Sequence, residues 1–529
     1  MAGAGMLAVM ALASQATAQT AASDPLMNAL IKKGILSEDE ARSIKAEADA
    51  NQSNNVPVIP ANWNKWKINS AIKSVELFGD IRLRYEGRHA DGPDGSRAQL
   101  ERARYALRLG LRGETAGGFY YGLRLETAAN PRSPWVTFAT SPGASATSSF
   151  QGPSGKAAAG INLGQIYLGW RPESWVELTV GKMPNPLYTT SMVWDPDLNP
   201  EGAAEHFKYT IGEADVFLNL GQFLYQDINP SYQSGNLGIN GLVGQKSDEV
   251  FQIAWQAGLN YNITTNLSAK IGATLYQYYG MKRSSILSGT TTSPYFGDPF
   301  VGEGAFTGVG TPFPVNGASG FGTGGSLPGN ASLSFPNNQV GLNHLNVVEV
   351  PFEINLKFRR FDAKVFGDFA YNLDGKQRAQ EAAAGYAAYL NLQKAASWVT
   401  VSPFAPQTDD VKAYQTGFAF GSKDSLGMVY GSVCRKNGWE VRGFWQHVEQ
   451  YALDPNLMDS DFFEGRGNLE GFYAAAAYGF SDNVLATVRY GHADRINKLL
   501  GTGGGNQDIP QVNPVQEYDI LQADLTFKF

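Results

Sequence analysis

The sequence predicts an all-β protein, a transmembrane antiparallel β-barrel of about 16 strands with a short N-terminal periplasmic helical segment. Three observations carry this prediction: apolar and polar residues alternate in long segments, short and long connections alternate along the chain, and the chain ends in an alternating segment. From Leu521 to Phe529 every second side chain is apolar. Because successive side chains leave a strand on opposite faces, this segment offers one face to lipid and the other to water.

The composition agrees with a barrel and argues against other classes. Hydrophobic residues make up 43% and charged residues 17% of the chain, and the mean hydropathy is -0.25. After the signal region no apolar run reaches the roughly 18 residues that a spanning helix needs. A net charge of -7 disfavours nucleic acid as a partner, and the single cysteine, Cys434, excludes an intramolecular disulfide.

Residues 1–18 are expected to form a signal peptide. An apolar stretch from Leu7 to Leu12 precedes Ala16-Thr17-Ala18, a small-x-small site at which a signal peptidase would cut. No Lys or Arg precedes the apolar stretch, which leaves a misplaced start, a truncated segment or a buried N-terminal helix as alternatives.

Residues 19–60 predict a periplasmic helical hairpin and a linker. Leu26 and Leu30 share one helical face, and Ser37 and Glu40 have the spacing of a capping box before a second short helix. Neither helix is long enough to be stable alone. We expect them to pack on each other, on the barrel mouth, or on a trimer partner or the cell wall.

From residue 61 to residue 529 the chain is expected to form the barrel. The period-two segments that predict strands are 75–86, 101–113, 118–128, 160–171, 175–183, 203–211, 214–225, 249–262, 267–280, 345–358, 361–372, 410–422, 438–450, 468–480, 484–495 and 516–529. Most even-numbered segments are followed by tight turns, and the others by long loops, of which 281–344 is the longest. This alternation is typical of bacterial outer-membrane barrels with periplasmic termini.

One connection breaks the alternation. Residues 423–437 stand where a short turn is expected, and their sequence LGMVYGSV is itself strand-like. An additional hairpin there would raise the number of strands to about 18.

The second predicted strand indicates that the interior is hydrated. Tyr105 and Leu107 lie on one face, and Arg102, Arg104 and Arg108 lie on the other. An arginine on the lipid face near the midplane costs roughly 2 to 4 kcal/mol, so the arginines must point inward. Unpaired charges are not tolerated in a dry interior, and we therefore expect a water-filled pore. Strands of a soluble sandwich are shorter, at about 5 or 6 residues.

Arginines of the first three predicted strands share the inward parity and form a basic wall. They are Arg82, Arg84, Arg102, Arg104, Arg108 and Arg124. One interpretation is a ladder of charge that attracts permeating anions. The other is internal ion pairing that braces the barrel, with Glu76, Asp80 and Glu126 as partners. Both can hold at once.

No motif points to catalysis, a metal or a cofactor. The five histidines are scattered, and GFGTGG at Gly320–Gly325 lies in a loop rich in Gly, Pro and Ser. No residue pattern singles out a nucleophile. We expect no enzyme, no metal and no cofactor. The alternatives to a pore are a structural or adhesin barrel with a plugged lumen and, less consistent with the sequence, a barrel hydrolase.

Several blocks resemble the family of putative porins of Gram-negative outer membranes, with a distant similarity to the phosphate-selective porins O and P. These blocks are KKGILSEDEA, VELFGDIRLRYE, LERARYALRLGLRGE, GQIYLGW, KMPNP, VWDPDLNPEG and the terminal LQADLTFKF. The resemblance implies an outer-membrane channel for passive diffusion of small hydrophilic solutes, and the basic wall would favour anions. It also implies outer-membrane lipid around a homotrimer, and recognition of Phe527 and Phe529 by the barrel-assembly machinery.

The segment 184–202 resembles by position the loop that folds into the lumen of sixteen-stranded general porins. That resemblance implies a constriction in which Asp195, Asp197 and Glu201 face the basic wall. The spacing of the first two acids also approaches that of a calcium loop. However, Pro200 stands where an EF-hand needs glycine, which disfavours that alternative.

Overall fold

The structure is a computed structural model that describes residues 33, 37, 71–93, 95–128, 133–138, 160–228, 248–280, 344–380, 409–502, 508–509, 512 and 514–529. The predicted signal peptide, nearly all of the helical hairpin with its linker and nearly all of the loop 281–344 lie outside the described residues. Within the described residues, no helix is long and apolar enough to cross a bilayer.

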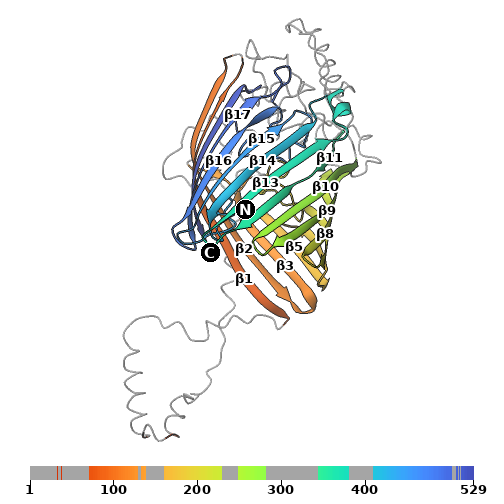
Figure 1. Ribbon diagram of the computed structural model, residues 1–529, viewed down its shortest axis with the longest axis vertical. Helices are drawn as coiled ribbons and strands as arrows, with labels where there is room; N and C mark the ends of the chain where they lie inside the picture. The colour runs from red at the N-terminus through yellow and green to blue at the C-terminus, as the bar shows by residue number, and fades with distance from the viewer. Residues whose placement is uncertain are drawn as a thin grey trace, which may run out of the picture. The chain divides into compact units, whose positions relative to one another are not determined.

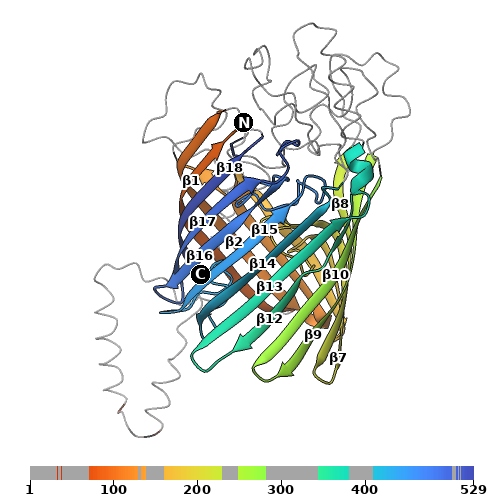
Figure 2. The ribbon, with the colours of Figure 1, turned by 45° about the horizontal axis from the view of Figure 1, so that its top comes forward.

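The described strands form one antiparallel sheet that closes on itself (Figure 1). They are β1 (Ile72–Asp91), β2 (Arg97–Thr115), β3 (Phe119–Ala128), β4 (Val136–Thr137), β5 (Gly160–Glu173), β6 (Val176–Lys182), β7 (Glu201–Ile211), β8 (Ala214–Ile228), β9 (Asp248–Thr264), β10 (Leu267–Gly280), β11 (Asn346–Glu349), β12 (Phe352–Lys357), β13 (Phe361–Asn372), β14 (Lys412–Ser422), β15 (Trp439–Val448), β16 (Leu469–Gly479), β17 (Val484–Arg495) and β18 (Glu517–Lys528). Strand β1 pairs with both β2 and β18, and the strands run obliquely around the barrel (Figure 2).

Within the described residues the barrel has 16 spanning strands, as predicted. β11 and β12 form one strand that is interrupted at Pro351, because proline has no N–H for the ladder. The Pro351 carbonyl still accepts a hydrogen bond from Gly272 of β10, at 3.0 Å. The two residues of β4 pair only with Arg104 and Tyr105 of β2 and do not span the barrel. The connection 423–438 contains turns and no strand, so the alternative of about 18 strands is wrong.

Side chains alternate between the two faces as the sequence predicts. On β1, Ile81, Leu83 and Tyr85 are 44–47% exposed, whereas Arg84 and Glu86 are at most 5% exposed. Apolar side chains therefore cover the outside, as a lipid-facing surface requires, and charged side chains line the inside.

The C-terminus closes the barrel. Gly79 and Phe529 exchange two backbone hydrogen bonds, of 2.9 and 3.1 Å. A Cβ atom at Gly79 would lie 2.4 Å from the Arg108 carbonyl oxygen and 2.7 Å from the Phe529 ring. Glycine is therefore the residue that fits where the first and last strands meet.

Candidate functional site

The β6–β7 loop, residues 183–200, lies across the lumen. On one side, Asp197 pairs with Arg108 of β2. On the other side, the Thr189 hydroxyl donates to Glu349 of β11 at 2.6 Å, and the Tyr188 N–H donates to a side chain of β9 at 2.8 Å. These partners sit on opposite parts of the wall, so the loop narrows the space between them. This is the segment in which the sequence predicted a constriction.

The β15–β16 loop, residues 449–468, also enters the lumen, which the sequence did not predict. Its Asp454 accepts hydrogen bonds from the hydroxyls of Tyr225 on β8 and Tyr278 on β10, at 2.6 and 2.8 Å. Its Asp461 accepts one from Arg84 on β1 at 3.0 Å. The β6–β7 and β15–β16 loops therefore both lie inside the barrel.

The two loops share a turn that is visible in the sequence, although such a turn does not encode the direction in which a loop folds. Asp195-Pro-Asp-Leu198 and Asp454-Pro-Asn-Leu457 both place Asp and Pro at the first two positions of a turn, where these residues are favoured. In each turn the Leu N–H donates to the Asp carbonyl, at 3.0 and 3.1 Å. The Asp side chain accepts the N–H two residues later, at 2.8 and 3.0 Å.

The two loops hold each other. The N–H of Asp195 donates to the Leu457 carbonyl at 2.6 Å, and the N–H of Asp459 donates to the Ser191 carbonyl at 3.1 Å. The side chain of Asp195 also accepts bonds from the N–H and hydroxyl of Ser460, at 3.2 and 3.1 Å. Movement of one loop would therefore disturb the other.

All six arginines of the predicted basic wall lie on the inward face, and each has a carboxylate within ion-pair distance. Together with Arg88 and Arg489, which the sequence interpretation did not include, they pair with eight carboxylates. On the strands these are Asp80, Glu86, Glu126 and Asp524, and on the loops they are Asp197, Asp461, Glu464 and Asp508. Half of the counter-charge therefore comes from the loops.

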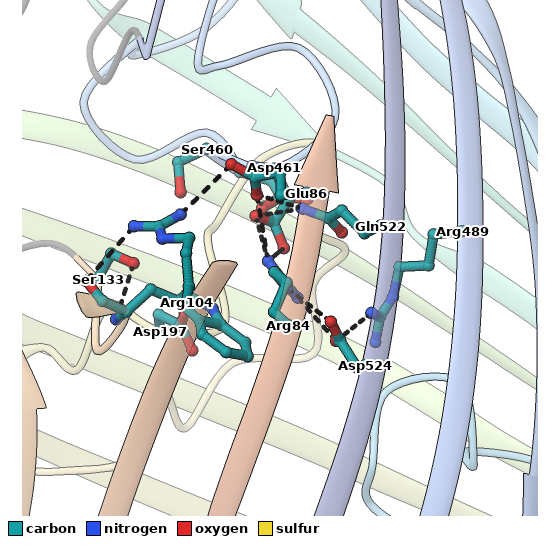
Figure 3. Close-up of polar contacts among 12 residues, drawn as sticks. Arg84, Glu86, Arg104, Ser133, Asp197, Ser460, Asp461, Arg489, Gln522 and Asp524 are labelled. Atoms are coloured by element: carbon teal, nitrogen blue, oxygen red, sulfur yellow. Dashed lines mark hydrogen bonds and ion pairs between the residues drawn. The ribbon is translucent and has the colours of Figure 1, made fainter. Parts of the chain in front are cut away.

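Glu86 and Asp461 lie at the centre of this wall, and Figure 3 shows them pointing toward Arg84. Arg84 Nε lies 2.7 Å from Asp524, and Arg88 Nε lies 3.1 Å from Glu86. These arginine side chains are 3% and 1% exposed. Charges this buried require partners, so the pairs brace the barrel wall.

Other wall arginines are more accessible or less tightly paired. The side chains of Arg82 and Arg124 are 21% and 14% exposed. Arg104 lies 3.6 Å from Glu86, and its Nε has no hydrogen-bond partner among the described residues. Arg82 is therefore the wall arginine most open to a passing anion, whereas the Arg104 side chain is only 7% exposed.

Two predicted acids have other partners. Glu76 pairs with Arg112 at 2.7 Å in an exposed position near the strand end. Glu201 begins β7 and pairs with Lys182 at 2.6 Å, where more than half of its side chain is exposed. It does not contact the arginine wall.

Burial and mutual repulsion change the protonation of the loop acids. Burial, with Asp459 and Asp197 nearby, raises the pKa of Asp195 well above its usual range. Burial, with Asp461 nearby, raises the pKa of Asp459 to about 7. Burial opposes ionisation of Asp461 too, but Arg84 and Arg88 outweigh it and lower the pKa of that group. Among the described residues, no group of His, Cys, Asp and Glu side chains is arranged to hold a metal ion.

The two terminal phenylalanines lie on the outward face of the barrel. Phe527 is 45% exposed and Phe529 is 43% exposed, and their ring centroids are 6.0 Å apart. Their predicted recognition by an assembly machinery remains a prediction.

Comparison with known proteins gives a family match. A model of the family described as "Putative porin" matches residues 94–529. Comparison with curated proteins finds no match.

Three similar solved structures are bacterial porins or outer-membrane proteins. An anion-selective porin from Comamonas acidovorans is 12% identical, with a TM-score of 0.39, and the match covers 86% of this chain and 99% of that chain. OmpT of Vibrio cholerae is 8% identical, with a TM-score of 0.34, over 88% and 100% of the two chains. A mutant of the Rh. blastica porin is 11% identical, with a TM-score of 0.34, over 86% and 100%. At these values the likenesses add nothing to an assignment of function.

Proposed function

This chain belongs to the family described as "Putative porin", and from that premise we propose that its barrel lets small hydrophilic solutes diffuse passively and favours anions. As a member of this family it is a β-barrel channel of the Gram-negative outer membrane. The family and the fold are those of a channel and not of an enzyme.

The charge of the wall carries the proposal of anion preference. Eight lumen-facing arginines on β1, β2, β3 and β17 share four strand carboxylates, which lie on β1, β3 and β18. The wall alone is therefore positive, and the loops bring the remaining acids to it. A permeating anion passes arginines that are only partly shielded, and a cation meets their repulsion.

The loop acids limit the size of this preference. They stand opposite the arginines at ion-pair distance, so much of the positive potential is cancelled near the centre of the wall. We therefore propose a moderate preference for anions and not an exclusive anion channel.

Partners follow from the same proposal. The apolar outer surface fits outer-membrane lipid, and we extend the proposal to a homotrimer and to recognition of the terminal strand by the barrel-assembly machinery. The solutes are small hydrophilic or anionic molecules.

A barrel with a plugged lumen is a second candidate, favoured by the two inward loops that bind each other and the wall. Swelling of liposomes that contain the refolded protein separates the two candidates. A channel gives swelling in isotonic solutions of small sugars, together with stepwise conductance in planar bilayers. A plugged barrel gives neither, and that result would contradict the proposed function.

A further inference from the structure

A cavity of about 500 Å³ lies in the lumen beside the β6–β7 loop. That loop bounds one side, the strands β12 to β15 form another, and the β14–β15 turn (residues 423–438) bounds a third. The residues that decide its chemistry are Tyr188, Trp194, Glu353, Lys364, Tyr430 and Arg442. Its volume is within the range of about 300 to 1,000 Å³ that is typical of ligand sites.

The β14–β15 turn is built to enclose this cavity. The N–H groups of Gly427 and Val429 donate to Glu440 at 2.8 and 3.0 Å, and Arg489 of β17 donates to the Val429 carbonyl at 2.8 Å. Met428 and Val429 are fully buried. The turn is therefore folded inward over the strands, and its apolar residues, which suggested a hairpin, pack inside the barrel.

Aromatic rings form one part of the cavity wall. The Arg442 guanidinium lies 4.5 Å from the ring centroid of Tyr430 and 5.0 Å from that of Phe366, so it packs against both rings. Tyr188 and Trp194 of the β6–β7 loop also line the cavity. Arg442 covers one face of the Tyr430 ring, but Tyr430 is still 46% exposed, so part of this ring is open to the cavity. An open aromatic ring offers apolar surface to the C–H groups of a flat, compact solute.

The charges of the cavity cancel. Lys364 pairs with Glu353 at 2.8 Å, and Arg442 pairs with Glu440 at 2.9 Å. The remaining polar groups of the lining, such as Thr189 and Gln415, are neutral. An anion entering here would meet Glu353 as well as Lys364, and thus gains no net attraction. A neutral solute with several hydroxyl groups finds both donors and acceptors.

We propose that this cavity binds a small neutral carbohydrate, with a pyranose ring against the aromatic faces and its hydroxyls on the Lys364–Glu353 pair. The assignment rests on the proposed function for access to the lumen. The β14–β15 turn is then part of the carbohydrate-binding site, because its residues line the cavity.

Ligand-observed NMR of the full-length protein in detergent tests the site independently of conductance. D-glucose should bind saturably. Sorbitol, which has no ring, and benzoate, which is an aromatic anion, should each bind at least about tenfold more weakly. A factor of about ten corresponds to the loss of one stacking contact. Tyr430→Ala should raise the Kd for glucose by about tenfold. The double variant Glu353→Gln with Lys364→Met should also raise the Kd for glucose by about tenfold, because the charged partners of the sugar hydroxyls are lost.

Tyr167→Ala is the matched control, because Tyr167 lines a different cavity that does not touch this turn. It should leave the Kd for glucose within about twofold. Equal effects of the Tyr167 and Tyr430 substitutions, or tighter binding of benzoate than of glucose, would overturn the assignment. Glucose binding by a protein that gives no conductance would support the site and contradict the proposed channel. Conductance without glucose binding would support the channel and overturn the site.

Discussion

Asp461 is a loop acid that lies within ion-pair distance of two wall arginines. It lies 3.0 Å from Arg84 and 3.7 Å from Arg88, and these arginine side chains are almost fully buried. Since Arg84 keeps Asp524 as a second partner, replacing Asp461 removes one negative charge without leaving that arginine unpaired.

Asp461→Asn should therefore raise the chloride-to-potassium permeability ratio, by about twofold or more, because one unit of wall charge is no longer cancelled. The measurement is the reversal potential in planar bilayers. Asp424→Asn is the control, since Asp424 pairs with Arg435 in an exposed position. An unchanged ratio in the Asp461 variant would mean that the loop acids do not set the selectivity.

Asp459 should make this selectivity depend on pH. Its pKa is raised to about 7 by burial and by Asp461, compared with 3.8 for an ordinary aspartate. Relative to the unfolded chain, the folded state therefore loses stability as pH rises from about 4 to about 7. Near pH 7 the group ionises in the folded state, which adds negative charge to the lumen.

The chloride-to-potassium permeability ratio should accordingly be higher at pH 6 than at pH 8. The Asp459→Asn variant should lose most of this difference between the two pH values. Reversal potentials at the two pH values and constant salt provide the measurement. A chloride-to-potassium ratio that rises with pH would contradict the gain of negative charge at Asp459.

Residue positions were more predictable than residue partners. The inward parity of Arg84 and Arg102 follows from period-two alternation, which is a local property of the chain. Asp461 is 377 residues from Arg84, and its approach depends on how a loop folds inside a closed barrel. No local pattern encodes that contact.

At the scale of single elements, the pairing of β1 with β18 depends on a glycine. A side chain at Gly79 would collide with the backbone of β2 and with the Phe529 ring. Gly87 on the same strand has open space where its Cβ would lie.

Gly79→Val should therefore lower the free energy of unfolding by about 1 to 3 kcal/mol, the usual cost of overpacking. The same substitution at Gly87 should change it by less than about 0.5 kcal/mol. Urea unfolding in lipid vesicles, followed by tryptophan fluorescence, measures both. Equal losses of stability in the Gly79 and Gly87 variants would show that the β1–β18 contact does not depend on a glycine at position 79.

The strands were predictable because lipid and water impose a strict alternation on them. The β14–β15 turn was not, because LGMVYGSV satisfies the same apolar criterion whether it faces lipid or packs in the lumen. The inward direction of the β15–β16 loop was not predictable either, because its turn motif indicates local geometry and not the direction in which the loop folds.

At the scale of the whole molecule, a positive wall and two acidic loops share one lumen. In the proposed function, the wall arginines give the channel a preference for anions, and the loops reduce that preference and narrow the passage. Arg102 and Arg104 stand on the same strand and contact the central Glu86, at 2.5 and 3.6 Å. Arg112 lies on that strand too, but in an exposed pair near its end.

The reversal potential across a KCl gradient tests this account most directly. We expect the wild-type value to lie toward the chloride equilibrium potential, and the Arg102→Ala, Arg104→Ala double variant to shift it toward that of potassium. Arg112→Ala should leave it unchanged, because an exposed pair is screened by salt. A wild-type value toward potassium, or a double variant that matches the wild type, would contradict the account.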